Sequence, residues 1–318
     1  MSYLKQRLLS LIPLALLVSF VSYGMLEILP GDPVATLLGV NATIPEQRAQ
    51  IVKELNLDQP FPVRYVKWLG QLFTGDFGLS YINRQPVTTY LKNSLPLSIE
   101  LVIYAMIIAL SVAIPLGILT AYRAGTRFDR MVSTLSFASL SVPGFVLAIL
   151  AIYLFAVRLS WFPAIGYTPL KDGVFDNLRS LFLPACVLAI GQIASFLRLL
   201  RTDMIATLQE DFITMAKAKG LSDRRILLRH ALKPSSFTLL TVAGGNFAAL
   251  LGGALVVEQT FALPGVGRMI VTAIGQRDYL VVLGGILIIT LGFLVITTLV
   301  DMLYGLLDPR IRHARALA

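Results

Sequence analysis

The sequence predicts an all-α protein that crosses a membrane several times. Hydrophobic residues make up 56% of the 318 positions and charged residues 14%, whereas about 25% is usual in soluble domains. The mean hydropathy is +0.76. A helix needs about 20 apolar residues to cross the hydrocarbon core of a bilayer. Six segments meet this requirement, at residues 8–29, 95–122, 132–157, 181–200, 234–257 and 280–306. Six crossings place both termini on the same side.

The first apolar run, 8–29, predicts a retained membrane span. It follows Lys5 and Arg7, as the core of a signal peptide does. A secretory core has about 7–15 apolar residues and ends at a small-residue cleavage site, whereas this run continues to Leu29 without one.

The distribution of positive charge predicts that both termini are cytoplasmic. Of the 27 lysines and arginines, sixteen lie in the termini and the loops on one side and five in the short loops on the other. The remaining six lie in segment 30–94, which is long enough for the positive-inside rule to weaken.

Segment 30–94 is expected to be a structured extracytoplasmic insertion. Thr43 and Glu46 form a capping-box pattern that predicts a helix as far as about Leu55. A second helix is expected over 62–74, ended by Gly75. Its apolar face is formed by Tyr65, Trp68, Leu69 and Leu72. We expect a small cap packed on the spans rather than a separate binding domain.

Several functions are disfavoured by what the chain lacks. The two histidines, His230 and His313, fall in predicted cytoplasmic segments, and there is no H-E-x-x-H, G-x-S-x-G or G-x-x-x-x-G-K-[ST] motif. We therefore expect no catalytic residues, no metal ligands and no ATP site on this chain. The single cysteine, Cys186, lies in an apolar run and reads as a small buried side chain. The basic residues alternate with spans instead of forming one stripe, which argues against nucleic-acid binding.

Four polar side chains within the predicted spans are candidates for a translocation pathway. Asn246 and Gln192 lie near the middle of their spans, and Ser139 and Ser141 precede Pro143. A polar side chain in hydrocarbon either faces water or bonds to a neighbouring helix, and the sequence leaves both options open. The span 234–257 also carries two ladders of small residues, which predict close helix contacts within the chain or with a partner. They are Gly244, Ala248 and Gly252, and Gly245, Ala249 and Gly253.

The basic stretch 211–234 predicts two short helices joined at Gly220 on the cytoplasmic surface. The second helix is expected to begin at Ser222 and to end before Pro234. One face of the first helix carries Phe212, Met215, Ala216 and Lys219. A connector lying on anionic lipid would have a similar composition, so membrane lipid is the alternative partner for this segment.

This helix, glycine, helix pattern resembles the EAA loop of ABC importer permeases. The strings EQTFALPGVGRMIVTAIGQRDY (258–279) and DMLYGLLDPRIR (301–312) are similar to the dipeptide and oligopeptide branch of that family. LPGDP (29–33), ELNLDQPFPVRYVKWL (54–69) and GDFGLS (75–80) are similar to the first permease subunit of the branch. The resemblance covers nearly the whole chain.

The resemblance implies a type I ABC importer permease fold, with residues 1–318 as one transmembrane domain in the plasma membrane of a prokaryote. It implies an extracytoplasmic insertion at about 30–94 and a cytoplasmic coupling loop at about 201–233. The implied partners are a second similar permease, two ABC ATPase subunits that bind ATP and Mg, and an extracytoplasmic peptide-binding protein. The implied ATPase contacts are Phe212, Thr214, Met215, Ala216, Lys219 and Gly220.

The chain departs from the family pattern within this loop. The Glu-Ala-Ala of the family falls on Thr214, Met215 and Ala216, so the acidic residue is absent, and the trailing proline comes one place late, at Pro234. Docking is therefore expected to depend on Phe212, Met215 and the glycine turn.

The cargo and the mode of transport have alternatives. Nickel, glutathione and haem importers share this branch. A self-sufficient ion-coupled carrier and an intramembrane enzyme are alternatives of other classes, although the acidic residues of the spans lie near span ends, which disfavours an ion-coupled carrier.

Overall fold

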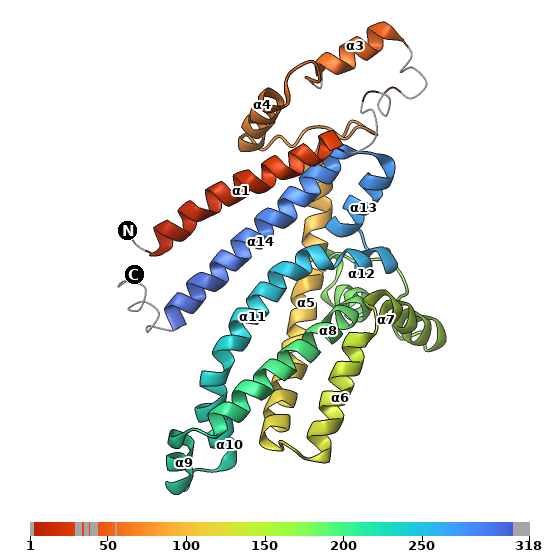
Figure 1. Ribbon diagram of the computed structural model, residues 1–318. Coiled ribbons are helices and arrows are strands. Elements are labelled where there is room, and N and C mark those ends of the chain that lie inside the picture. The colour runs from red at the N-terminus through yellow and green to blue at the C-terminus, as the bar shows by residue number, and fades with distance from the viewer. Residues whose placement is uncertain (1–2, 29–33, 35–37, 39–43, 55, 308–318) are drawn as a thin grey trace. The chain divides into compact units, whose positions relative to one another are not determined.

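The computed structural model describes residues 3–28, 34, 38, 44–54 and 56–307. The chain divides into two compact units, Met1–Ser98 with Pro264–Leu294, and Ile99–Leu263 with Val295–Ala318. The described residues are predominantly helical (Figure 1), and their only β pairing is one isolated bridge between Leu79 and Pro86. Each unit is described separately below.

The first unit contains the insertion and the helices that support it. Its helices are α1 (Tyr3–Ile28), α3 (Pro45–Glu54), α4 (Phe61–Phe73), the start of α5 (Val87–Tyr122), α13 (Val266–Gln276) and the first part of α14 (Tyr279–Leu307). The helix predicted over 62–74 is confirmed as α4, which follows Pro60 and ends before Gly75, whose φ is 81°. The predicted capping box involves Thr43, and the helix that it opens was predicted to end at about Leu55. Both residues lie outside the described residues.

The aromatic face of α4 packs inward, as predicted. Trp68 is 6% exposed and forms a cluster with Leu283 and Leu287 of α14. The ring of Tyr23 on α1 lies 4.9 Å from the ring of Trp68, and the hydroxyls of Tyr65 and Ser19 share a 2.8 Å hydrogen bond. The face is therefore occupied by contacts within its own unit.

A short loop after α4 is fastened to the end of α13. The hydroxyl of Ser80 donates to a carboxylate oxygen of Asp278, and the backbone N–H of Tyr81 donates to the other oxygen at 3.0 Å. Ser80 and Asp278 are both buried. Burial, followed by the nearby Tyr23 and then the Asp278 charge, raises the pKa of Tyr81 above its ordinary value.

The second unit is a bundle of long helices. It contains the rest of α5, α6 (Arg127–Ser141), α7 (Gly144–Ala151) with a π-helical continuation (Ile152–Arg158), α8 (Val174–Leu208), α9 (Asp211–Ala218), α10 (Asp223–Arg225), α11 (Leu232–Gly253) and α12 (Leu255–Thr260). A π-helical segment, Ile226–Ala231, joins α10 to α11. Pro234 lies inside a helical run that is continuous from Asp223 to Thr260, just after the π-helical segment, so helical structure continues past the residue at which it was expected to stop.

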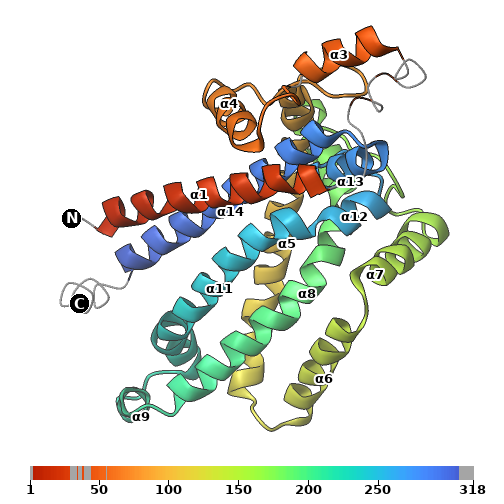
Figure 2. The same ribbon diagram turned by 45° about the horizontal axis from the view of Figure 1, so that its top comes forward.

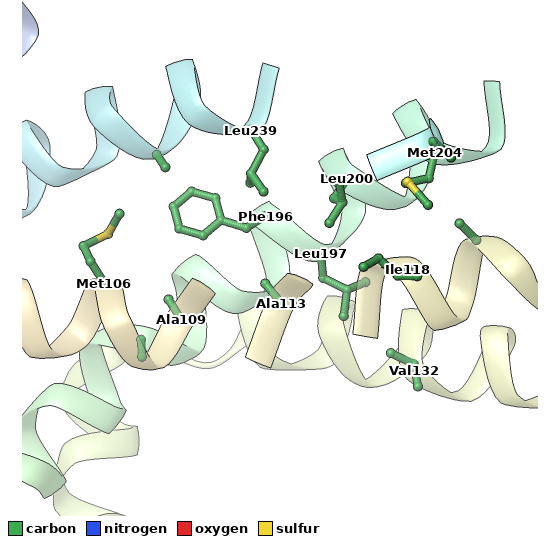
Figure 3. Packing of buried hydrophobic residues seen from close by; sticks show 14 of the residues in the cluster. Met106, Ala109, Ala113, Ile118, Val132, Phe196, Leu197, Leu200, Met204 and Leu239 are labelled. Carbon is green, nitrogen blue, oxygen red and sulfur yellow. The ribbon is translucent and has the colours of Figure 1, made fainter. Parts of the chain in front are cut away.

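Phe196 of α8 is one of the largest fully buried side chains in the core of this unit. It is fully buried between Met106 of α5 and Leu239 of α11 (Figure 3). A Cβ atom at Gly117 of α5 would lie 3.1 Å from the side chain of Leu200, so glycine allows α5 and α8 to approach closely.

The predicted third span is broken in two. Helices α6 and α7 are bent by 100° relative to each other at Val142 and Pro143 (Figure 2). The proline ring disfavours helical backbone at the preceding residue, and Val142 has an extended conformation with ψ 124°. The described residues contain four helices long and apolar enough to span a membrane, or five with this bent pair, beside a shorter apolar stretch Ile12–Gly24 in α1. Six spans with cytoplasmic termini stay a prediction.

The two small-residue ladders of α11 differ in their surroundings. A Cβ atom at Gly244 would collide with Val300 of α14, so this ladder makes a close contact within the chain. No atom lies within 4 Å of such a position at Gly245 or Gly253. The second ladder therefore makes no such close contact at these two glycines.

Candidate functional site

The short helix α9 lies between the end of α8 and the start of α10, and Gly220 closes it (Figure 1). Gly220 has φ 73°, a left-handed conformation that favours glycine. The backbone N–H of Leu221 then donates to the carbonyl of Ala216 at 3.3 Å. The predicted helix, glycine, helix arrangement is confirmed.

One face of α9 is fixed to the bundle. Ile213 is 0% exposed and Ala216 is 6% exposed, and both belong to the core that contains Met204 of α8 and Ile226 after α10. Ala216, which was expected at the partner contact, therefore packs against its own chain. Ile213 was not singled out from the sequence, although its i, i+3 spacing with Ala216 was the signal for an inward face.

The other face of α9 presents apolar side chains to the surface. Phe212 is 45% exposed and Met215 is 59% exposed. Thr214 and Lys219 are also exposed. Large apolar side chains displayed on a helix that is itself well anchored are typical of a docking surface.

A hydrogen bond connects this segment to the end of α5. The hydroxyl of Tyr122 donates to a carboxylate oxygen of Asp223 at 2.7 Å. Both residues line a hollow of about 280 Å³ beside α9, together with Lys217 and Ile226. The two partners are 101 positions apart, and no sequence pattern connected them.

The start of α11 is fastened to the end of α8 on the same side. The hydroxyls of Thr207 and Ser235 share a hydrogen bond of 2.9 Å, and Ser235 is 2% exposed. Helix α9 is therefore flanked by two long helices that are tied to each other.

The two mid-span amides lie together. The amide nitrogen of Asn246 on α11 donates to the amide oxygen of Gln192 on α8 at 2.8 Å, and both side chains are partly exposed. The interhelical hydrogen bond that the sequence left open is thus present. A role in the translocation pathway stays a prediction.

The two candidate serines bond to their own helix. Ser139 donates to the carbonyl of Ser136 at 2.8 Å, and Ser141 donates to the carbonyl of Phe137 at 3.2 Å. Bonds of this kind bend helices, and these two immediately precede the break before α7.

An ion pair between a partly exposed arginine and a buried aspartate, which the sequence did not indicate, joins α6 to α8. The guanidinium of Arg201 donates to both carboxylate oxygens of Asp129 at 2.6 and 2.7 Å. Asp129 is 3% exposed and also accepts from the backbone N–H of Gly125 at 2.9 Å. The available signal was Asp129 three residues after the helix-capping Thr126.

These features define an α-helical membrane protein with a short, surface-exposed helix held between two long ones. Residues 113–313 match the family described as "Binding-protein-dependent transport system inner membrane component", and residues 1–102 match the family of its N-terminal part. The chain belongs to this family of inner membrane components. It is a multi-pass protein of the bacterial plasma membrane and one component of a larger transport system.

Curated relatives match nearly the full length. A putative peptide transport system permease protein from Brucella abortus (strain 2308) is 42% identical over 97% of this chain and 98% of its own. A di/tripeptide transport system permease protein from Pseudomonas aeruginosa (strain UCBPP-PA14) is 35% identical over 99% and 100%. An oligopeptide transport system permease protein from Bacillus subtilis (strain 168) is 33% identical over 98% and 99%.

A solved structure shares the fold. The crystal structure of an amino acid ABC transporter with histidines matches with a TM-score of 0.50 at 17% identity, over 70% of this chain and 94% of that chain. At this identity the match supports the permease fold alone.

Proposed function

We propose that this chain is a permease subunit of an ATP-driven ABC importer of dipeptides or oligopeptides and forms half of the translocation pathway. Near full-length similarity to permease proteins of peptide transport systems supports the cargo class. The proposed coupling to ATPases rests on the two faces of α9. Ile213 anchors one face in the core, and the other face exposes Phe212 and Met215.

The proposed complex contains a second permease chain, two ABC ATPase subunits and an extracytoplasmic peptide-binding protein. ATP and Mg would bind to the ATPases, since this chain has no P-loop motif. Segment 30–94 is proposed as the extracytoplasmic insertion, and 201–233 as the cytoplasmic coupling loop.

Helix α9 is proposed to transmit motion from the ATPases to the spans. Phe212 and Met215 would enter a cleft on an ATPase, with Thr214, Lys219 and the Gly220 turn beside them, as an apolar helix face enters a groove. Because Ile213 is packed in the bundle core, a displacement of α9 would be passed to α8 and α11. Closure of the ATPases around ATP would thereby shift the equilibrium between outward-open and inward-open states.

The paired amides Gln192 and Asn246 lie on those same two helices and are proposed to border the pathway. Each amide has both donors and acceptors, which suits the backbone groups of a peptide. Replacing each residue with leucine is expected to impair uptake without preventing assembly. Normal uptake by both variants would assign the pair to packing alone.

Reconstitution in proteoliposomes tests the proposal. The chain alone is expected neither to transport nor to hydrolyse ATP, and peptide uptake should require the second permease, the ATPases, ATP and the binding protein. Transport by the chain alone would indicate an ion-coupled carrier, and turnover by the chain alone would indicate an enzyme. Mass spectrometry of ligand bound to the intact complex distinguishes peptides from nickel, glutathione and haem.

A further inference from the structure

A groove of about 430 Å³ lies between α6 and α8, and none of its lining residues carries the proposed docking by α9 or the Gln192–Asn246 pair. On α8 its lining includes Ala194, Leu197, Arg198 and Arg201, whereas Gln192 on the same helix bonds to α11. Helices α6 and α8 run side by side here (Figure 2).

Polar and apolar groups are separated along the length of the groove. On α6 the lining begins with Asp129, Arg130 and Ser133 and continues to Phe137 and Leu140. On α8, which runs in the opposite direction, Arg198, Arg201 and Thr202 lie level with the polar end, whereas Ala194 and Leu197 come earlier. The distance from Arg130 to Leu140 along the helix is about 15 Å. The groove thus has a charged end, formed around Arg130 and Arg198 and called the mouth below, and an apolar end, formed around Phe137 and Leu140 and called the floor below.

The charged mouth carries a net positive charge. The Asp129 carboxylate and the Arg201 guanidinium neutralise each other in their bidentate pair. Arg130 and Arg198 are exposed, and within the described part of the chain neither is engaged in an ion pair. The guanidinium of Arg198 lies 5.6 Å from the centre of the Phe137 ring, which orients it at the boundary between the charged and apolar ends.

Helix α6 also exposes apolar side chains next to the groove. Met131 is 54% exposed and Leu135 is 62% exposed. Such side chains are expected to face lipid, so the groove would be open to the bilayer. The positive-inside prediction places its basic mouth at the cytoplasmic surface, where the leaflet is rich in anionic lipids.

We propose that this groove binds an anionic phospholipid of the cytoplasmic leaflet. The phosphate would lie between Arg130 and Arg198, where guanidinium groups match phosphate oxygens, and one acyl chain would follow Phe137 and Leu140. The charge of the mouth, the apolar floor and their order along the membrane normal all fit an amphiphile with an anionic head. The proposal goes beyond the transport function and requires only that the chain spans the membrane with the predicted sidedness.

Native mass spectrometry of the full chain, purified with the subunits that accompany it, tests this proposal by titration with phosphatidylglycerol. The double variant Arg130→Gln, Arg198→Gln is expected to bind phosphatidylglycerol roughly thirtyfold more weakly. The matched control is Arg123→Gln, Arg127→Gln, which removes the same charge from two exposed arginines near the start of α6 that do not line the groove. Phosphatidylcholine should bind weakly to all three proteins. Equal phosphatidylglycerol binding by the unaltered chain and the double variant, or equal losses in the two double variants, would overturn the proposal.

A second pair of variants examines the apolar floor, so the test does not rest on arginine variants alone. Leu140→Gln should weaken phosphatidylglycerol binding, whereas Leu135→Gln, an exposed leucine of α6 outside the groove lining, should not. Inorganic phosphate should fail to displace the lipid, because it lacks the acyl chain. Displacement by phosphate would indicate a simple anion site, and displacement by peptides would indicate a cargo subsite. Cross-linking of position 140 to another subunit would indicate a protein interface. Each of these three results would contradict lipid binding.

Discussion

The segment before α8 and the segment after it are fastened by different kinds of interaction. Before α8, the connection from the π-helical continuation of α7 is held by hydrogen bonds centred on Asn177, which is 0% exposed. Asn177 accepts from the hydroxyl of Tyr104 at 2.8 Å and donates to Glu100 and to the carbonyl of Thr168, each at 2.9 Å. Tyr167 donates to the same Glu100 oxygen at 3.0 Å.

After α8, helix α9 is held mainly by apolar packing of Ile213 and Ala216 and by the hydrogen bond between Tyr122 and Asp223. Buried hydrogen bonds are directional and costly to leave unmade, whereas apolar contacts tolerate small shifts of the packed surfaces. The difference indicates that the first segment is locked in place. The second segment, which contains α9, is suited to being displaced by a partner that binds Phe212 and Met215.

The largest expected effect is the loss of the apolar anchor beneath α9. Ile213→Ala removes a fully buried side chain from the core and is expected to reduce the free energy of unfolding by about 3 kcal/mol. Thermal unfolding of the purified chain measures this. Met215→Ala on the same helix should leave stability nearly unchanged, because Met215 is exposed. Equal destabilisation by both would mean that α9 has no distinct inward face.

Breaking the hydrogen-bond network before α8 should cost about 2 kcal/mol. Asn177→Leu leaves the Tyr104 hydroxyl and the Thr168 carbonyl without this partner and removes one of two donors to Glu100, and each part-buried group that loses its partner carries a desolvation penalty. Limited proteolysis should show cleavage within 159–173 in this variant. Unchanged proteolysis and thermal stability would show that the network does not lock this segment.

Docking of α9 is expected to weaken by roughly thirtyfold, or about 2 kcal/mol, in Met215→Asp and Gly220→Val. The first variant places a charge at the proposed apolar anchor, and the second strains a residue whose φ is 73°. Both chains should insert and pair with the second permease, yet release the ATPases or uncouple hydrolysis from uptake. Coupled transport in proteoliposomes with a purified ATPase pair is the measurement. Full coupling in both variants would favour a role of α9 on the lipid surface.

A smaller effect is expected from Tyr122→Phe, which deletes the hydroxyl that binds Asp223 and keeps the ring. The change in coupling should be about twofold, the value of one solvent-accessible hydrogen bond. The ratio of ATP hydrolysed to peptide transported reports it. Asp223→Asn retains an acceptor and should have less effect, whereas larger losses in Asp223→Asn would point to a role of the carboxylate outside this bond.

The smallest effect concerns pH. Burial, followed by the hydrogen bond to Glu100, raises the pKa of Tyr167 to about 12 from its ordinary value of 10.0. A raised pKa means that the folded state holds the proton more tightly. The stabilising contribution of Tyr167 is therefore complete below about pH 10 and is lost as the pH rises towards about 12. Thermal unfolding of the chain and of Tyr167→Phe across this range should diverge only above pH 10, and parallel curves would contradict the assignment.

Features that depend on local composition were predictable. The lengths of the apolar runs require membrane-spanning helices because a bilayer has a defined thickness. The left-handed turn at Gly220 and the inward face of α4 follow from the conformational freedom of glycine and from helical spacing. The departure from the Glu-Ala-Ala pattern at 214–216 was likewise visible in the residues themselves.

Features that depend on which distant residues meet were decided by the tertiary structure. The bonded partners Asp129 and Arg201 are 72 positions apart, and Tyr122 and Asp223 are 101 positions apart. The sequence around a carboxylate does not indicate which distant residue will bind it. The same holds for the inward burial of Ala216, which the sequence placed on the docking face, since a small side chain permits close approach to either neighbour. Pro143 was visible in the sequence, but the size of the 100° bend that follows it depends on how the two flanking helices pack. Helical periodicity and span length act within one segment, whereas pairing and burial arise only when separate segments compete for the same contacts.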